Sequence, residues 1–190
     1  KAASARQETM MKIMQLNEEG KSAEALAELD KVVAAEKDDD AKLDLSLTRF
    51  MLLAKSDEAA AIKFARELST GAAKDSAQAL YAMSSMMIEN PQVKNPDFGL
   101  AVDMLTRACE LHRAENDNKD HPALLAPLAK AKFKKGDIDG AIATQEAALK
   151  LIDIGLEGRF TFPAGMDFGA LRRGRLRSER ESLEREGRAA

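Results

Sequence analysis

The sequence contains no tryptophan, and among its 190 residues it has only one tyrosine, Tyr81, and one cysteine, Cys109. A single cysteine excludes a disulfide within the chain and a zinc site built from several cysteines. The two histidines, His112 and His121, fall in different predicted elements without metal-ligand spacing. No stretch approaches the roughly 18 consecutive apolar residues of a membrane-spanning helix. With a net charge of −3, the whole chain has no strong field toward nucleic acid or anionic lipid.

Recognised catalytic and nucleotide-binding motifs are also missing. The glycines are isolated, so neither GxxxxGK[ST] nor GxGxxG occurs, and no serine has a G-x-S-x-G setting. The run 38–40 lacks the glycine and terminal glutamate of a calcium loop, so we interpret it as a solvated turn. We expect Cys109 to be a buried, inert thiol and His121 to cap a helix. The sequence therefore predicts no enzymatic activity, no metal and no cofactor.

Alanine, leucine, lysine and glutamate dominate the chain, and all favour or tolerate helices. Alternating Val/Ile/Thr runs are absent, so we expect an all-α fold without strands. Apolar periodicity, turn residues and prolines predict eight helices in four consecutive pairs. Their approximate ranges are 4–19, 22–35, 41–54, 58–70, 76–88, 96–115, 122–135 and 138–152.

In addition to His121, polar residues at helix starts are the expected N-caps of six helices. They are Ser4, Ser22, Asp40, Asp75, Asn95, which is followed by Pro96 as the expected first helical residue, and Asp137. Apolar residues three or four positions apart mark the expected buried faces. In the helix at 41–54, the apolar residues expected to share one face are Leu43, Leu47, Phe50 and Ala54.

Two stretches far apart in the chain have similar sequences. EEGKSAEALAELDKVV begins at residue 18, and KKGDIDGAIATQEAALKL begins at residue 134. The alignment pairs Gly20 with Gly136 and Ala25 with Ala141. Glycine permits a tight turn, and a small residue permits close helix approach. Small residues near the start of each second helix, at Ala25, about Ala60, Ala101 and Ala141, recur in steps of roughly 35, 41 and 40 residues, typical of paired-helix repeats.

This pattern resembles the tetratricopeptide repeat. In the last unit the residues at the motif positions are Leu125, Leu128, Ala129, Gly136, Ala141, Ala148 and Leu149, and in the first unit they are Ile13, Gly20, Ala25, Leu29 and Val32. The motif's tryptophan is missing, Lys132 stands at its tyrosine position and Asp153 at its proline position. The resemblance covers about 7–153. It implies a right-handed α-solenoid of about four antiparallel helix pairs over 1–155; an unrelated solenoid of four helical hairpins is the alternative.

Proteins of this repeat family bind extended peptides on the groove lined by the first helix of each pair. Carried over to this chain, the resemblance implies groove residues Met10, Met14 and Asn17 in the first unit and Lys130, Phe133 and Lys134 in the last. For the methionines, flexible core filling is the alternative. For Phe133 and its flanking lysines, the alternative is a solvated helix end.

The resemblance therefore implies a non-enzymatic scaffold that binds a protein or peptide partner, with no small-molecule cofactor. The alternative is an accessory helical-repeat region of a larger protein, attached for example to a thioredoxin-like enzyme domain. The start at Lys1 rather than Met suggests a processed or partial chain. A cytoplasmic and an exported location both stay open, as does homo-oligomerisation.

The composition changes at residue 156. Residues 156–190 contain eight arginines and no lysine, which predicts a linker and a C-terminal helix starting near Asp167. That helix could be the polar cap that repeat arrays need. The stretch LRRGRLR at 171–177 could instead contact phosphate or an acidic partner, but the glutamates beside it oppose nucleic-acid binding.

Overall fold

The computed structural model describes residues 2–91, 93–156, 177–178, 180–182 and 184–185. These residues form helices and connections without any strand, which confirms the expected all-α class. None of the described helices is sufficiently long and apolar to span a membrane. The predicted cap at Asp167 and the stretch 171–176 lie outside the described residues. The chain divides into two compact units, residues 1–97 and 98–190, and each is described by itself.

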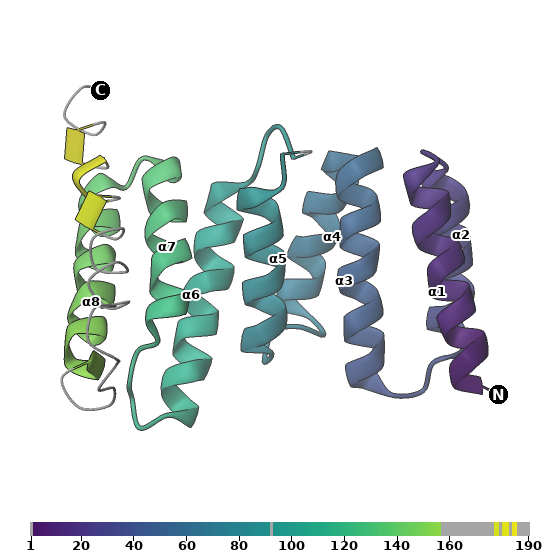
Figure 1. The fold of residues 1–190 in the computed structure, drawn as a ribbon, viewed down its shortest axis with the longest axis horizontal. Coiled ribbons are helices and arrows are strands. Elements are labelled where there is room, and N and C mark those ends of the chain that lie inside the picture. Colours follow the sequence, from purple (N-terminus) through teal and green to yellow (C-terminus); the bar gives the residue numbers. More distant parts are fainter. Residues whose placement is uncertain (1, 92, 157–176, 179, 183, 186–190) are drawn as a thin grey trace, which may run out of the picture. The chain divides into compact units, whose positions relative to one another are not determined.

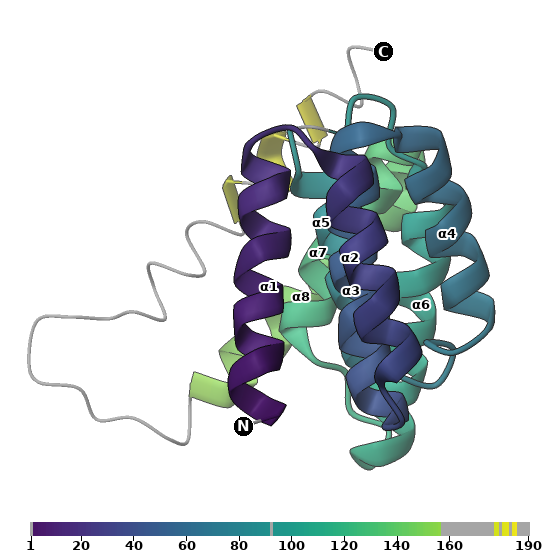
Figure 2. The same ribbon diagram turned by 90° about the vertical axis from the view of Figure 1, so that its right-hand side faces the viewer.

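Unit 1 contains five helices (Figure 1). They are α1 (Ala2–Glu18), α2 (Ser22–Ala35), α3 (Asp39–Ser56), α4 (Glu58–Thr70) and α5 (Ala77–Glu89). α1 lies beside α2 (Figure 2), and α3 packs against α2, α4 and α5. α1, α2 and α3 share a core cluster of Ile13, Ala25, Leu29, Leu45 and Leu52. α3 is thus the helix that connects the others in this unit.

Unit 2 contains α6 (Phe98–Glu115), α7 (Pro122–Lys135) and α8 (Ile138–Leu156). α7 packs against both α6 and α8. A described part of the C-terminal segment contacts α8, since a guanidinium nitrogen of Arg180 lies 3.6 Å from a carboxylate oxygen of Glu146. The helix bounds in both units agree closely with those expected from periodicity and turn residues.

The two similar stretches of sequence form the same turn, around Gly20 and around Gly136. The amide of Gly20 donates to the Asn17 carbonyl and that of Lys21 to the Leu16 carbonyl; 116 residues later, Gly136 donates to Phe133 and Asp137 to Lys132. These paired bonds close each helix in a Schellman motif. Both glycines have positive φ, +78° and +94°, which L side chains rarely adopt.

The small residues after these turns occupy one repeated position. The amides of Ala25, Ala61 and Ala141 each donate to the carbonyl four residues earlier, at the start of their helices. These three residues and Ala101 are at most 1% exposed. The second position is therefore Ala61, one residue beyond the expected place near Ala60, and the steps along the chain are 36, 40 and 40 residues.

Several of the expected N-caps are wrong in unit 1. α1 begins at Ala2, so Ser4 lies inside this helix rather than before it. α3 begins before Asp40, because the carboxylate of Asp38 accepts from the Ala41 amide at 2.8 Å. Ser22 is the buried first residue of α2 rather than its cap. Consecutive aspartates have equal capping propensity, and starting at Asp38 leaves Asp39 and Asp40 in the first turn, where the helix dipole favours a negative charge.

The remaining cap assignments have different outcomes. α6 begins at Phe98, so Asn95 is not the residue before this helix and Pro96 is not its first residue. α5 is capped by Ser76, whose hydroxyl accepts from the Ala79 amide at 3.2 Å, so the expectation of Asp75 is wrong by one residue. Asp137 is confirmed, since its carboxylate accepts from the Gly140 amide at 3.0 Å.

A buried polar side chain interrupts the repeat. Four residues after the small residue, α2, α4, α6 and α8 each have a buried position, and the residues there are Leu29, Ala65, Leu105 and Gln145. Gln145 is 2% exposed, and its Nε2 has no hydrogen-bond partner. An unpaired buried donor costs roughly 1–3 kcal/mol of stability.

Replacing Gln145 by Leu, which matches Leu29 and Leu105, is expected to raise the free energy of unfolding by about 1 kcal/mol. The physical reason is removal of the unpaired donor at nearly constant volume. Urea denaturation followed by circular dichroism measures the change, and the reciprocal Leu105→Gln variant is expected to lose about 2 kcal/mol. A Gln145→Leu chain less stable than the wild type would contradict this assignment.

Alanine at Gly20 or at Gly136 is expected to destabilise the chain by about 1 kcal/mol, and by a similar amount at both places. No atom lies within 4 Å of a Cβ added at either glycine, so the cost comes from the backbone conformation alone. Thermal unfolding of the two single variants measures it. A loss at one glycine and none at the other would show that the two turns are not equivalent in solution.

Candidate functional site

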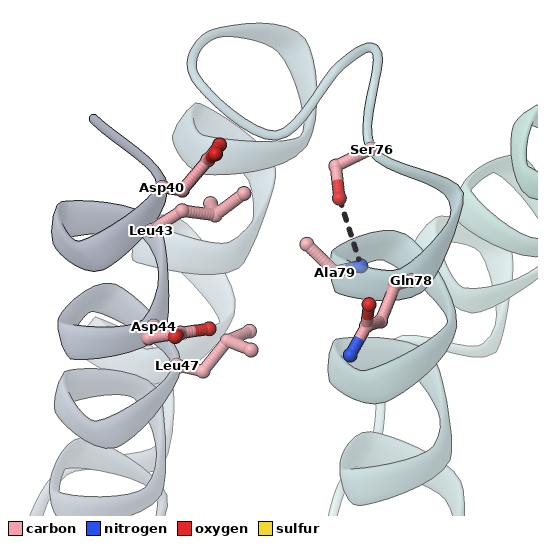
Figure 3. A pocket seen from close by; sticks show the side chains of 7 residues that line it. All are labelled: Asp40, Leu43, Asp44, Leu47, Ser76, Gln78 and Ala79. Atoms are coloured by element: carbon pink, nitrogen blue, oxygen red, sulfur yellow. Dashed lines mark hydrogen bonds between the residues drawn. The ribbon is translucent and has the colours of Figure 1, made fainter. Parts of the chain in front are cut away.

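A groove with a volume of about 390 Å³ lies between α3 and α5 in unit 1. Its lining residues are Asp40, Leu43, Asp44, Leu47, Ser76, Gln78 and Ala79. Figure 3 shows the side chains from α3 and those from α5 facing each other across the space. The Ser76 hydroxyl on this rim is already used as the N-cap of α5. The groove therefore presents carboxylates, a carboxamide and leucine methyl groups.

Two of the carboxylates near the start of α3 are left without a counter-ion. Asp38 caps the helix, and Asp39 receives the Lys42 ammonium at 2.8 Å, a hydrogen bond that lowers the pKa of Asp39. Asp40 and Asp44 are exposed, and the described part of the chain offers neither of them an ion pair. Like charges at i and i+4 destabilise a helix by about 0.2–0.5 kcal/mol. The groove thus carries an uncompensated negative pair.

The leucines beside these carboxylates are less buried than the other two residues expected on their helix face. Phe50 and Ala54 are buried as expected, but Leu43 and Leu47 are only partly buried and line the groove. α3 instead contributes Leu45 to the core that it shares with α1 and α2. Helical periodicity groups Leu43 with Leu47, but the neighbours of α3 decide which of its faces are covered.

Among the described residues of unit 1, four large apolar side chains outside the groove lining are exposed. The large hydrophobic residues that stay exposed in the described chain are Met11 at 60%, Met14 at 45%, Met51 at 37% and Tyr81 at 37%. Met51 follows Leu47 by four residues and Tyr81 follows Gln78 by three, so each lies on the helix face that lines the groove. All four residues belong to α1, α3 or α5.

The binding residues expected in the first unit all lie on α1. Met10 is partly buried against the core cluster, whereas Met14 is exposed. Asn17 is half-buried, its backbone carbonyl accepts from the Lys55 ammonium, and its side-chain oxygen has no partner. Of the three methionines of α5, Met83 and Met87 are core residues and Met86 is partly buried. A binding role for the α1 residues stays a prediction.

The residues expected in the last unit lie together near the end of α7. Lys130 and Lys134 are exposed, and Phe133 is half-buried with the Lys134 ammonium 5.7 Å from its ring centroid. Lys130 is as many residues before Gly136 as Met14 is before Gly20, and the same holds for Phe133 and Asn17. The two pairs of residues are therefore at equivalent positions. The two sets belong to different units, and the role of the α7 set also stays a prediction.

The histidines and the cysteine are structural in unit 2. His121 caps α7 as expected, because its Nδ1 accepts from the Ala123 amide at 3.2 Å, and its ring meets that of His112 edge-on with centroids 5.1 Å apart. Cys109 is 4% exposed, and burial raises the pKa of its thiol to about 11, with the nearby Asp120 charge adding to the rise. Within the described ranges, no three His, Cys, Asp or Glu residues are placed to hold a metal ion.

Cys109 predicts a loss of stability at alkaline pH. The folded thiol has a pKa of about 11 against 9.0 for a free one, so the folded chain binds the proton more tightly. This contribution is present below pH 9 and is lost as the pH rises toward 11. The free-energy difference between wild type and Cys109→Ala should fall by about 2 kcal/mol across that window, since lysine titration is common to both chains. A pH-independent difference would contradict burial of the thiol.

The groove was not expected from the sequence. Its one detectable signal is the acidic pair Asp40 and Asp44, spaced one helical turn apart and interleaved with leucines. Comparison with protein-family models, with curated proteins and with solved structures gives no significant match. The site must therefore be interpreted from its own geometry.

Proposed function

We propose that this chain is a non-enzymatic interaction scaffold, a right-handed α-solenoid of tetratricopeptide type. It binds an extended segment of a protein partner on the face formed by the first helix of each pair. The observation that carries the proposal is the location of the exposed large apolar side chains. Among the described residues they all lie on α1, α3 and α5, and none lies on α2 or α4.

The burial of apolar side chains supports a binding role for the first helices and a packing role for the second helices. In the described helices α2 and α4, the residues Ala25, Leu29, Ala61, Ala65 and Leu68 are buried, and no large apolar side chain of either helix is exposed. Unpartnered apolar side chains at a concave place favour a binding surface, because water contact there is costly and a partner can relieve it. The groove between α3 and α5 provides such a place.

The repeated turns support the tetratricopeptide-type architecture. Equivalent residues make equivalent hydrogen bonds around Gly20 and Gly136, and Ala25 and Ala141 after them are fully buried. A helix pair stacked in this way buries one face against its neighbours and leaves the other available. The proposal includes a peptide-binding role for Met10, Met14 and Asn17 on α1, and for Lys130, Phe133 and Lys134 on α7.

A random peptide library displayed on phage and selected against the purified full chain tests the proposal. Selected peptides are expected to bind the double variant Met51→Ser, Tyr81→Ser at least about tenfold more weakly, because two apolar contacts are removed. Fluorescence anisotropy with labelled peptides measures the dissociation constants, and circular dichroism checks that the variant remains folded.

The matched control is the double variant Ala27→Ser, Ala59→Ser. Both alanines are exposed on second helices, α2 and α4, and the change is also from apolar to hydroxyl. The control is expected to bind the peptides as the wild type does. Equal loss in both variants, or no loss in the first, would remove the first-helix face as the binding site.

A further inference from the structure

We propose that the groove between α3 and α5 selects a basic segment, an extended peptide whose Lys or Arg side chain binds between Asp40 and Asp44 while apolar side chains beside it cover Leu47 and Met51. The inference rests on the proposed function for the peptide nature of the ligand. It adds the charge and the side-chain pattern of that ligand.

The first argument is charge complementarity. Asp40 and Asp44 both line the groove, are one helical turn apart and have no cationic partner in the described chain. A favourable interaction of Asp40 with the helix dipole would account for a carboxylate in the first turn, but Asp44 lies beyond that turn. A cation bound between the carboxylates would relieve their mutual repulsion, whereas an anionic peptide would increase it.

The second argument is that apolar groups adjoin the acidic pair. Leu43 and Leu47 line the same groove, and Met51 continues the row one turn further along α3. A guanidinium or ammonium group carries an aliphatic stem that packs on such methyl groups while its charged end meets the carboxylates. The site is therefore suited to an amphipathic side chain more than to a bare inorganic cation.

The third argument is spacing. In an extended peptide, side chains two residues apart lie on the same side and are about 6.6 Å apart. This distance is close to the rise of four residues along α3, which is about 6 Å. A cationic residue opposite Asp40 and Asp44 thus places apolar residues two and four positions further along near Leu47 and Met51. Tyr81 is exposed on α5, the helix on the other side of the groove, and offers the peptide further apolar contact area.

The test uses three end-capped peptides, each with two tandem copies of X-Ser-Leu-Ser-Leu, where X is Arg, Gln or Glu. Nuclear magnetic resonance titration of the full chain follows the amide signals of α3 and α5. The Arg peptide is expected to shift signals near Asp40, Asp44 and Gln78 and to bind at least about tenfold more tightly than the Gln peptide. Its affinity should fall as salt screens the charges, and the Glu peptide should not bind.

The test variant is Asp40→Asn with Asp44→Asn, which is expected to reduce the affinity for the Arg peptide to that for the Gln peptide. The control is Glu24→Gln with Glu67→Gln, which makes the same change in net charge on exposed positions of α2 and α4. The control should keep at least most of the wild-type affinity. An equal loss of affinity in both variants would mean that the net charge of the chain, and not the groove, determines binding of the Arg peptide.

The outcomes separate this inference from the proposed function. If the Gln and Arg peptides bind the same residues equally and the Asn variant is neutral, the basic preference is wrong while peptide binding stands. If none of these peptides binds and phage selection also fails, both proposals fall. If calcium ions alone shift the same signals at micromolar concentration, or if the Asn variant abolishes a dimer of the chain instead, the groove has another occupant and the inference is overturned.

Discussion

Close helix packing at one repeated small residue is the constraint on which the rest of the structure depends. Ala25, Ala61, Ala101 and Ala141 are all at most 1% exposed, near the starts of α2, α4, α6 and α8. A larger side chain at these positions would force the packed helices apart, since interiors have no room for extra methyl groups. The positive-φ glycine before two of them makes the required turn possible.

This constraint decides which surfaces remain available. Among the described residues of unit 1, no large apolar side chain of α2 or α4 is exposed, so the exposed large apolar side chains lie on α1, α3 and α5. α3 packs Leu45 and Leu52 into the shared core and keeps Leu43 and Leu47 beside α5. The groove is the consequence of a helix with apolar residues on more than one face and neighbours that cover only some of them.

Local conflicts with ideal packing concentrate at particular residues. Gln145 is polar where the equivalent positions hold Leu29, Ala65 and Leu105, and its buried Nε2 has no hydrogen-bond partner, which is expected to lower the stability of unit 2. The pair Asp40 and Asp44 repels along α3, yet it lines a groove where a basic ligand would turn that repulsion into affinity. Such departures from internal consistency are where functional sites are expected.

The sequence by itself determined the local structure. Glycine, proline and apolar periodicity were sufficient for eight helices, for the two equivalent turns and for the buried alanines, because each depends on the residue and its near neighbours. Only the tertiary structure decided that Asp38 rather than Asp40 caps α3, and that Leu43 and Leu47 line a groove. Periodicity tells which residues share a helix face, but the position of the neighbouring helices decides whether that face is covered, and here that placed Asp44 opposite Gln78 of α5.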